Sequence, residues 1–293
     1  MLWHTEGQIM KLHRFLPIVV VAVACAVAAI AADKVELKYK PPVGQVETKL
    51  MDAQLSSLEL GGTPLGVAAT ATAKLRTTID AVNADEKTIA MTAEFSDATA
   101  EFNGQPQKQP KLDPVAIKMS CCGEIKEFKN KGEGLDLFGT GGVPLQLIAG
   151  IAGVIRLPDT AVAVGDKWDA DFEQEFPTVG KVKIKSNSEL TAMKDGVATV
   201  KTTYSTTLPD FEAPNPMQPG AKINVQGAKL SVEKFVRDFD TKTSSVRKAE
   251  GTLVIEANVD VQGFAAPVKM AADFHLIDSR FAPKETQEPK PAG

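Results

Sequence analysis

The sequence predicts an all-β protein with one short apolar helix, built as a curved antiparallel sheet or half-barrel from two pseudo-repeats. Two observations carry this prediction. Most of the chain after residue 32 alternates apolar and polar side chains with a period of two, which is typical of strands that bury one face. The same order of features also occurs twice along the chain: a Val-Gly dipeptide, a long hairpin, a proline-rich loop and a strand–turn–strand unit.

Composition excludes several classes of protein. The chain has 293 residues, of which 43% are hydrophobic and 24% charged, with a formal net charge of −4. This chain is too apolar to be disordered and too acidic to bind nucleic acid through a basic surface. Three cysteines are too few for a disulfide scaffold.

The N-terminal segment, residues 1–31, has the pattern of a secretory signal peptide. Lys11 and Arg14 precede an apolar run over residues 15–32, and Ala29-Ile30-Ala31 provides a small-x-small cleavage site. We therefore expect a bacterial protein that is exported to the periplasm or the extracellular space. Two alternatives remain open: an uncleaved membrane anchor, because the run approaches the roughly 20 residues that span a bilayer, and lipidation at Cys25.

The period-two pattern places strands along the rest of the chain. We expect them over Val35–Tyr39, Val67–Val82, Thr88–Phe102, Val115–Met119, Ile125–Lys129, Trp168–Phe176, Lys183–Met193, Val197–Thr207, Leu230–Phe239, Thr252–Val261 and Val268–Ile277. The predicted organisation is a first β half (32–132), a linker with the apolar helix (133–157), a second β half (158–282) and a disordered tail (283–293).

The linker contains the one segment that breaks the β pattern. Residues 143–155 are apolar nearly all round, and Pro144 suits the first turn of a helix. An apolar helix of this length must be buried, either as an ordinary core helix or as a plug over a hydrophobic cavity. In the second interpretation the ligand-binding lining is Leu145, Leu147, Ile148, Ile151 and Ile155.

In the second half, two hairpins have recognisable signals. Asp195-Gly196 is a dipeptide that tolerates positive φ in a tight turn. The preceding hairpin should have an odd-numbered loop, because this register places acids opposite lysines. The expected pairs are Glu175 with Lys181, Glu173 with Lys183 and Asp171 with Lys185. The acidic row could instead hold a cation, but strand spacing spreads the carboxylates about 6–7 Å apart.

Residues that could carry catalysis are sparse. Without residues 1–31 the chain keeps one histidine, His275, and two cysteines, Cys121 and Cys122. His275 lies in an alternating strand, where it is structural or serves as a lone base. Cys121 and Cys122 could be free thiols, a vicinal disulfide with redox function or an intermolecular bridge. We expect no catalytic residues, no metal site and no cofactor, and therefore no enzyme.

The segment from Leu157 to Trp168 resembles an "LPxxxVxVGDxW" motif of exported bacterial β-rich proteins of uncharacterised function. In it, Gly165 permits a turn, Asp166 can bond the turn backbone and Trp168 anchors the next strand. The architecture is also similar to the half-barrels of lipoprotein carriers and related lipid-binding proteins. This resemblance implies a curved sheet around a helix, with an apolar concavity for acyl chains.

We therefore expect a non-enzymatic cell-envelope protein that binds a lipid or other hydrophobic ligand. The alternative is a structural or protein-interaction module of the envelope that meets an envelope protein partner and takes no small molecule. No nucleic-acid partner is expected.

Overall fold

A computed structural model describes residues 34–107, 114–129, 153–176, 180–214, 222–261 and 264–282. The chain divides into two units, residues 1–34 and 35–293, and the fold described below belongs to the second. In the described residues, no helix combines the length and the apolar character that crossing a membrane requires.

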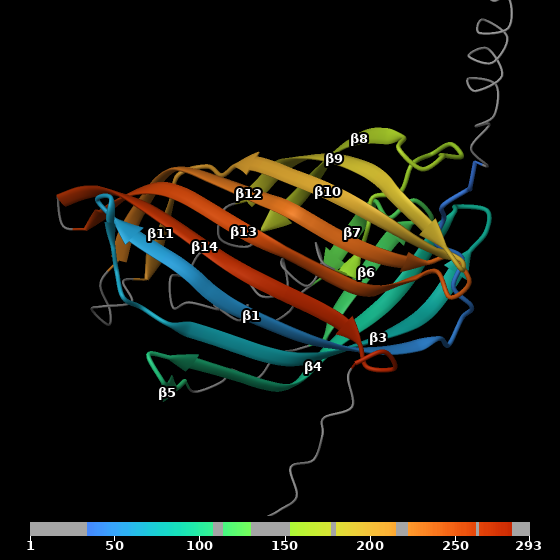
Figure 1. The fold of residues 1–293 in the computed structure, drawn as a ribbon, viewed down its shortest axis with the longest axis horizontal. Coiled ribbons are helices and arrows are strands. Elements are labelled where there is room, and N and C mark those ends of the chain that lie inside the picture. The colour runs from blue at the N-terminus through green and yellow to red at the C-terminus, as the bar shows by residue number, and fades with distance from the viewer. Residues whose placement is uncertain are drawn as a thin grey trace, which may run out of the picture. The chain divides into compact units, whose positions relative to one another are not determined.

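The described residues form one antiparallel sheet of 14 strands, ordered β7-β6-β4-β3-β1-β14-β13-β12-β10-β9-β8, with three short strands, β2, β5 and β11, beside this path (Figure 1). The strands are β1 (Val46–Leu60), β2 (Thr63–Pro64), β3 (Ala69–Asn83), β4 (Thr88–Phe102), β5 (Gln105–Pro106), β6 (Val115–Ser120), β7 (Ile125–Lys129), β8 (Lys167–Phe176), β9 (Gly180–Lys194), β10 (Val197–Thr207), β11 (Phe211–Pro214), β12 (Lys222–Asp240), β13 (Ser245–Val261) and β14 (Phe264–Asp278).

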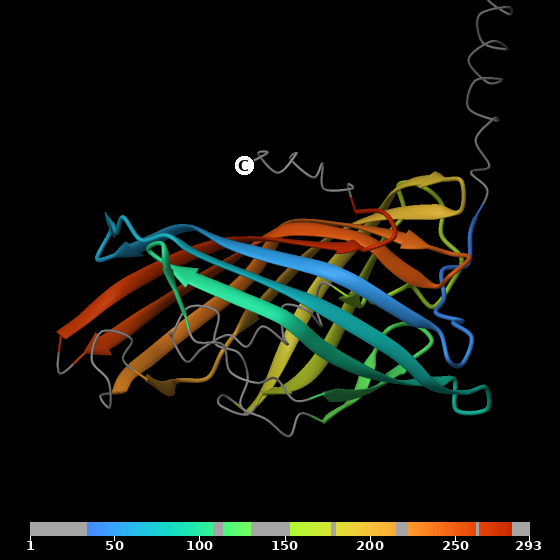
Figure 2. The same ribbon diagram turned by 90° about the horizontal axis from the view of Figure 1, so that it is seen from below.

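The order of the strands in the sheet follows the chain in two runs. Strands β1 to β7, the first half, run from the centre to one edge, and strands β8 to β14, the second half, return from the other edge. The halves meet where β1 pairs with β14, from Lys49 opposite Asp278 to Leu60 opposite Val268. This arrangement confirms the predicted all-β fold of a curved antiparallel sheet (Figure 2).

Several predicted strands have the observed bounds. Thr88–Phe102, Ile125–Lys129 and Val197–Thr207 are β4, β7 and β10 without a change. One predicted strand was wrong, and one long strand was missed. Val35–Tyr39 makes only an isolated bridge, from Val35 to Val162, and β1 was not predicted at all. The missed strand is the one that joins the two halves.

Both hairpin predictions in the second half are confirmed. Asp171 pairs with Lys185, Glu173 with Lys183 and Glu175 with Lys181, as the odd-numbered loop required. At the next turn, Asp195 and Gly196 have φ values of 53° and 81°. Positive φ at both central residues is the signature of a type I′ turn, whose twist matches that of the flanking strands.

The sheet curls around one apolar face, here called the concave face. The side chains that cover this face differ between the two halves. In the second half it is filled by aromatic rings that contact one another across β8, β10, β12 and β14. Their centroid distances are 6.5 Å for Phe172–Tyr204, 6.0 Å for Tyr204–Phe235 and 5.2 Å for Phe235–Phe274. In the first half the buried positions of β1, β3 and β4 include the small side chains Ala53, Ala71, Ala73 and Ala93.

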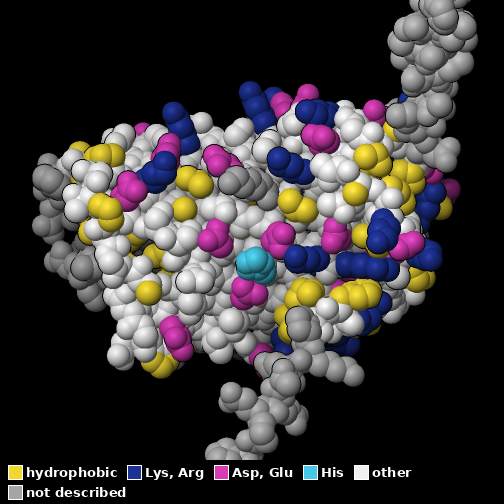
Figure 3. Space-filling view, viewed as in Figure 1, with side chains coloured by type: hydrophobic (Ala, Val, Ile, Leu, Met, Phe, Trp, Pro, Cys, Tyr) yellow, Lys and Arg dark blue, Asp and Glu magenta, His cyan; other side chains and the backbone are white. Residues whose placement is uncertain are grey.

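The opposite, convex face of the sheet is solvated. Lysine, arginine and acidic side chains are interspersed over it among hydrophobic ones (Figure 3). Register shifts interrupt most of the long pairings, for example between Leu55 and Ser57 in β1 and between Thr202 and Tyr204 in β10. Such bulges bend a strand and increase its twist, so they help the sheet to curl.

Candidate ligand cavity on the concave face

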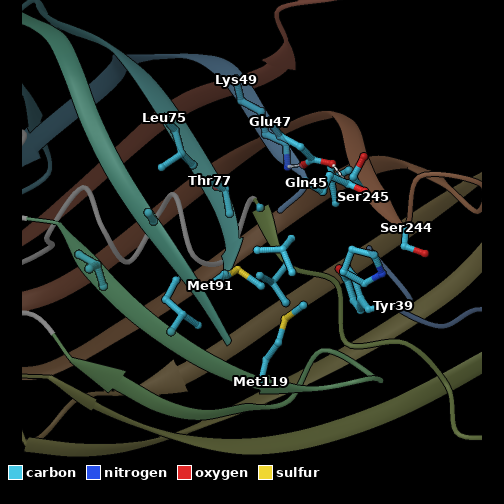
Figure 4. A pocket seen from close by; sticks show the side chains of 18 of the residues that line it. Tyr39, Gln45, Glu47, Lys49, Leu75, Thr77, Met91, Met119, Ser244 and Ser245 are labelled. Carbon is cyan, nitrogen blue, oxygen red and sulfur yellow. Dashed lines mark hydrogen bonds and ion pairs between the residues drawn. The ribbon is translucent and has the colours of Figure 1, made fainter. Parts of the chain in front are cut away.

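A cavity of about 70 Å³ opens on the concave face of the first half. Its wall is mostly apolar and comes from three neighbouring strands (Figure 4). The wall includes Leu75 and Ile79 of β3, Met91 and Phe95 of β4, and Ile117 and Met119 of β6. Ala93 of β4 also lines it, and Ser245 and Val246 of β13 complete the lining from the second half.

One side of the cavity is charged. Gln45, just before β1, and Glu47 and Lys49 on β1 lie side by side (Figure 4). The Lys49 ammonium is 3.1 Å from Oε2 of Glu47, and only 6% and 8% of these side chains are exposed. The amide of Gln45 donates to Oε1 of Glu47 at 2.6 Å and to the Thr243 carbonyl at 3.0 Å. The site thus combines an apolar wall with a buried ion pair.

A second ion pair, Asp278 with Arg280, lies next to the charged side of the cavity at the end of the adjacent strand β14. Asp278 of β14 stands opposite Lys49 in the register, and it accepts hydrogen bonds from the backbone and Nε of Arg280, both at 2.9 Å. Burial alone would raise the pKa of the Asp278 carboxyl, but its bonds to Arg280 and the charge of Lys49 outweigh burial and lower it. Asp278 is therefore held as a carboxylate.

Asp240, at the end of β12, is also a buried carboxylate that pairs with an arginine. It accepts bonds from Nε of Arg247 at 2.8 Å and from the backbone of Lys242 at 2.8 Å. Burial opposes ionisation, but the bonds from Arg247 and from the backbone of Lys242 and Thr243 lower the pKa of Asp240 below its usual range. The turn after β12, which brings Ser244 and Ser245 to the cavity, is fixed by this carboxylate.

The segment that contains Tyr39 and the segment that contains Val154 and Ile155 cross the concave face beside the cavity. The Tyr39 hydroxyl accepts a bond from the Ile155 backbone N–H at 2.7 Å, and burial raises the pKa of Tyr39 above its usual range. Arg237 of β12, fully buried, donates to the Val154 carbonyl at 2.9 Å and to Thr202 at 2.6 Å. These bonds hold the end of the predicted apolar segment against the sheet.

The predicted ligand lining is only partly within the described residues. Leu145, Leu147, Ile148 and Ile151 lie outside them, as does most of the predicted helix. Ile155 is described and is fully buried in the main core. It does not line the cavity, whereas its neighbours Gly153 and Val154 do.

The cysteine pair forms the turn between β6 and β7, outside the cavity. Cys121 and Cys122 are free thiols, with their sulfur atoms 3.9 Å apart. Burial, a hydrogen bond to Asp159 and the neighbouring thiol raise the pKa of Cys122 to about 12. A thiol with such a pKa is a poor nucleophile, because the thiolate is the reactive form.

His275 is on the convex face, away from the cavity. Its Nδ1 lies 3.9 Å from Oε2 of Glu250, and about half of the side chain is exposed. Within the described ranges, no three histidine, cysteine or acidic side chains are grouped closely enough to hold a metal ion.

The motif from Leu157 to Trp168 behaves locally as expected. Gly165 has a φ of 95°, Asp166 accepts a bond from the Ala163 backbone at 2.9 Å, and Trp168 packs against the core while donating to the Arg156 carbonyl at 2.8 Å. The motif therefore starts β8 and fixes the incoming crossing segment.

The charged side of the cavity was not predicted from the sequence. Residues 47, 49, 51, 53 and 55 of β1 are all buried, but the first two are Glu47 and Lys49. Charged residues at inward positions conceal the alternation of hydrophobicity on which strand prediction depends. The signal that was available is the run Met51, Ala53 and Leu55, each followed by a polar residue.

Comparisons with known proteins add little. No protein-family model matches the chain, and no curated protein matches it. A structure of lipovitellin and its lipid–protein interactions aligns with 86% of this chain, at 11% identity and a TM-score of 0.43, and this chain spans 27% of its length. DynF from the dynemicin biosynthesis pathway of Micromonospora chersina aligns over 88% of this chain and 90% of its own, at 8% identity and a TM-score of 0.26. Scores at this level carry no argument about function.

Proposed function

We propose that this protein is an exported, non-enzymatic cell-envelope protein that binds a hydrophobic ligand on the concave face of its sheet. The observation that supports this proposal is the cavity between β1, β3, β4 and β6, which has an apolar wall and a charged side. A mostly apolar concavity with a few convergent polar groups is the usual form of a small-molecule site.

The size of the cavity limits how a ligand would bind. About 70 Å³ is less than the roughly 300–1,000 Å³ of pockets that take drug-sized ligands. The ligand would therefore place only a small part of itself there. Met91 and Met119 contribute to the wall, and methionine side chains are unbranched and adapt readily to a guest.

Bound ligand should be detectable in protein purified without detergent. The full chain would be exported from a bacterial host, purified and examined by native mass spectrometry, with organic extraction of any adduct. We expect one apolar molecule per chain. Absence of an adduct, together with no uptake of added alkyl esters, would contradict the proposal.

A cavity-filling variant locates the site. Ala93 is buried and lines the cavity, so Ala93→Leu should occupy the space and reduce ligand occupancy at least about tenfold, since each added methylene displaces roughly 0.8 kcal/mol of ligand burial. Ala81→Leu, on an exposed position of β3, is the matched control and should bind as the parent does. Equal binding by the Ala93→Leu variant would place the ligand elsewhere.

Export is tested separately. The basic, apolar and small-x-small pattern of residues 1–31 supports cleavage after Ala31. N-terminal sequencing of the exported protein should therefore begin at Ala32. A retained N-terminus in the membrane fraction would favour the anchor instead.

The second candidate function is a structural or protein-interaction module of the envelope. The small volume of the cavity favours it, as do the charged pairs on the convex face, such as Lys269 with Glu256 at 2.9 Å. This function predicts recovery of a protein partner with no small-molecule adduct.

A further inference from the structure

We infer that the ligand presents an uncharged hydrogen-bond acceptor, such as an ester or amide carbonyl, to Lys49 rather than a free carboxylate. The inference rests on the proposed function and names the chemical class of its ligand. It follows from two properties of the charged side of the cavity: unused donors and balanced charge.

Lys49 supplies the unused donors. An ammonium group has three N–H donors. Among the described residues, one acceptor lies close to Nζ of Lys49, Oε2 of Glu47 at 3.1 Å. Buried polar groups are nearly always hydrogen-bonded, and this side chain is 6% exposed and lines the cavity. The remaining donors are therefore available to an acceptor in the cavity.

The charge of Lys49 is already compensated. Glu47 neutralises it directly, and Asp278, which faces Lys49 across β1 and β14, is in turn paired with Arg280. The group therefore holds two cations and two anions. A ligand carboxylate would add a negative charge with no partner of its own, and an unpaired buried charge is costly. A neutral carbonyl oxygen accepts the same hydrogen bonds without that cost.

The apolar wall fits the other end of such a ligand. Met91 of β4 and Met119 of β6 lie on the strands beyond β3, on the far side of the cavity from Lys49 (Figure 4). A carbonyl at Lys49 would direct its alkyl chain towards these side chains. The arrangement suits a neutral amphiphile whose carbonyl group is attached close to its alkyl chain.

Three probes of one chain length test the inference. Methyl decanoate, decanoate and decylamine would be titrated into the ligand-free protein at about pH 8, where the acid is ionised, and their Kd values compared by native mass spectrometry. We expect the ester to bind at least about tenfold more tightly than the acid or the amine. Equal or tighter binding of the acid would overturn the inference. Failure of all three probes to bind would instead contradict the proposed function.

Two variants test the residues. Glu47→Gln leaves the charge of Lys49 uncompensated, so the preference should shift towards decanoate. Glu47→Leu with Lys49→Met replaces the ion pair by apolar groups, and the ester should then lose at least about tenfold in affinity because its donor is gone. Lys74→Met, an exposed lysine of the neighbouring strand, is the control and should change nothing. An unchanged ester affinity in the double variant would overturn the inference. The probe series on the parent protein remains decisive if the Glu47→Gln variant does not fold.

Discussion

At the scale of single residues, Gly123 fixes how the crossing segment meets the sheet. Its φ is 79°, and a Cβ atom at this position would lie 2.1 Å from the Ile155 carbonyl oxygen. Next to it, the Cys122 carbonyl accepts the Leu157 backbone N–H at 2.8 Å. Glycine is required here by both conformation and space, so the short turn after β6 determines where residues 155–157 lie.

Gly123→Ala should therefore destabilise the protein by about 2–5 kcal/mol, since the strain of a left-handed residue adds to a steric clash. Denaturant unfolding measures the loss. Gly104→Ala is the control, because Gly104 has a φ of 75° with nothing near its Cβ position. It should lose only about 1–2 kcal/mol. Equal losses would show that the contact with Ile155 has no energetic effect.

The buried carboxyl groups predict how stability responds to acid. The pKa values of Asp240 and Asp278 are lowered in the folded protein. Groups with a depressed folded pKa contribute stability above their unfolded pKa, about 3.9, and this contribution is lost as pH falls through the folded pKa. We expect the free energy of unfolding to fall below about pH 4.

Asp278→Asn removes one of these groups and should flatten that dependence, at the cost of lower stability near neutral pH. The measurement is denaturant unfolding between about pH 2 and 7. A parent protein whose stability does not change over this range would contradict the expected role of both carboxylates.

At the scale of elements, the charge pattern and the burial pattern specify the same register of β8 on β9. Acids of β8 face lysines of β9 in the backbone register, and Asp171 makes a diagonal ion pair, with its Oδ2 3.3 Å from Nζ of Lys183. Both side chains are about half exposed, so each contact contributes little energy. A slip by one residue would still turn the apolar side of β8, with Trp168 and Phe172, towards solvent.

Asp171→Asn should accordingly cost only about 0.2–1 kcal/mol, and the cost should vanish in about 1 M salt because exposed charges are screened. A double-mutant cycle with Lys183→Met isolates the pair. A coupling energy above about 2 kcal/mol would mean that Asp171 and Lys183 are shielded from water and not exposed.

At the scale of the whole molecule, the pairing of β1 with β14 makes the two halves one sheet. β1 and β14 lie in the middle of the sheet order, whereas β7 and β8 form the edges. Strands with partners on both sides exchange their amide hydrogens only through larger openings than edge strands do. Hydrogen exchange can therefore show whether the two halves open together as one sheet.

Native-state hydrogen exchange should show the slowest amides in β1 and β14 and faster exchange in β7 and β8. Mass spectrometry of peptic fragments resolves these strands. If β1 exchanged as fast as the edges while the strands of the second half stayed protected, the halves would unfold separately and the central pairing would not unite them.

The sequence by itself determined the fold class, most strand positions and the turns, because these depend on local alternation and on residues such as Asp195 and Gly196 that tolerate positive φ. It also determined the register of β8 on β9, since acids and lysines recur with the period of a strand. The hydrophobic ligand site and the signal peptide remain predictions.

Only the tertiary structure decided where the cavity lies and what lines its charged side. Glu47 and Lys49 are buried on β1, an interior strand of the sheet, and that position depends on pairing with β14, more than 200 residues away in the chain. Hydrophobic periodicity cannot place charged residues inside, since their burial is stabilised by each other and by neighbours distant in sequence. The same holds for the contrast between the alanine side and the aromatic side of the concave face, which only the order of strands in the sheet brings together.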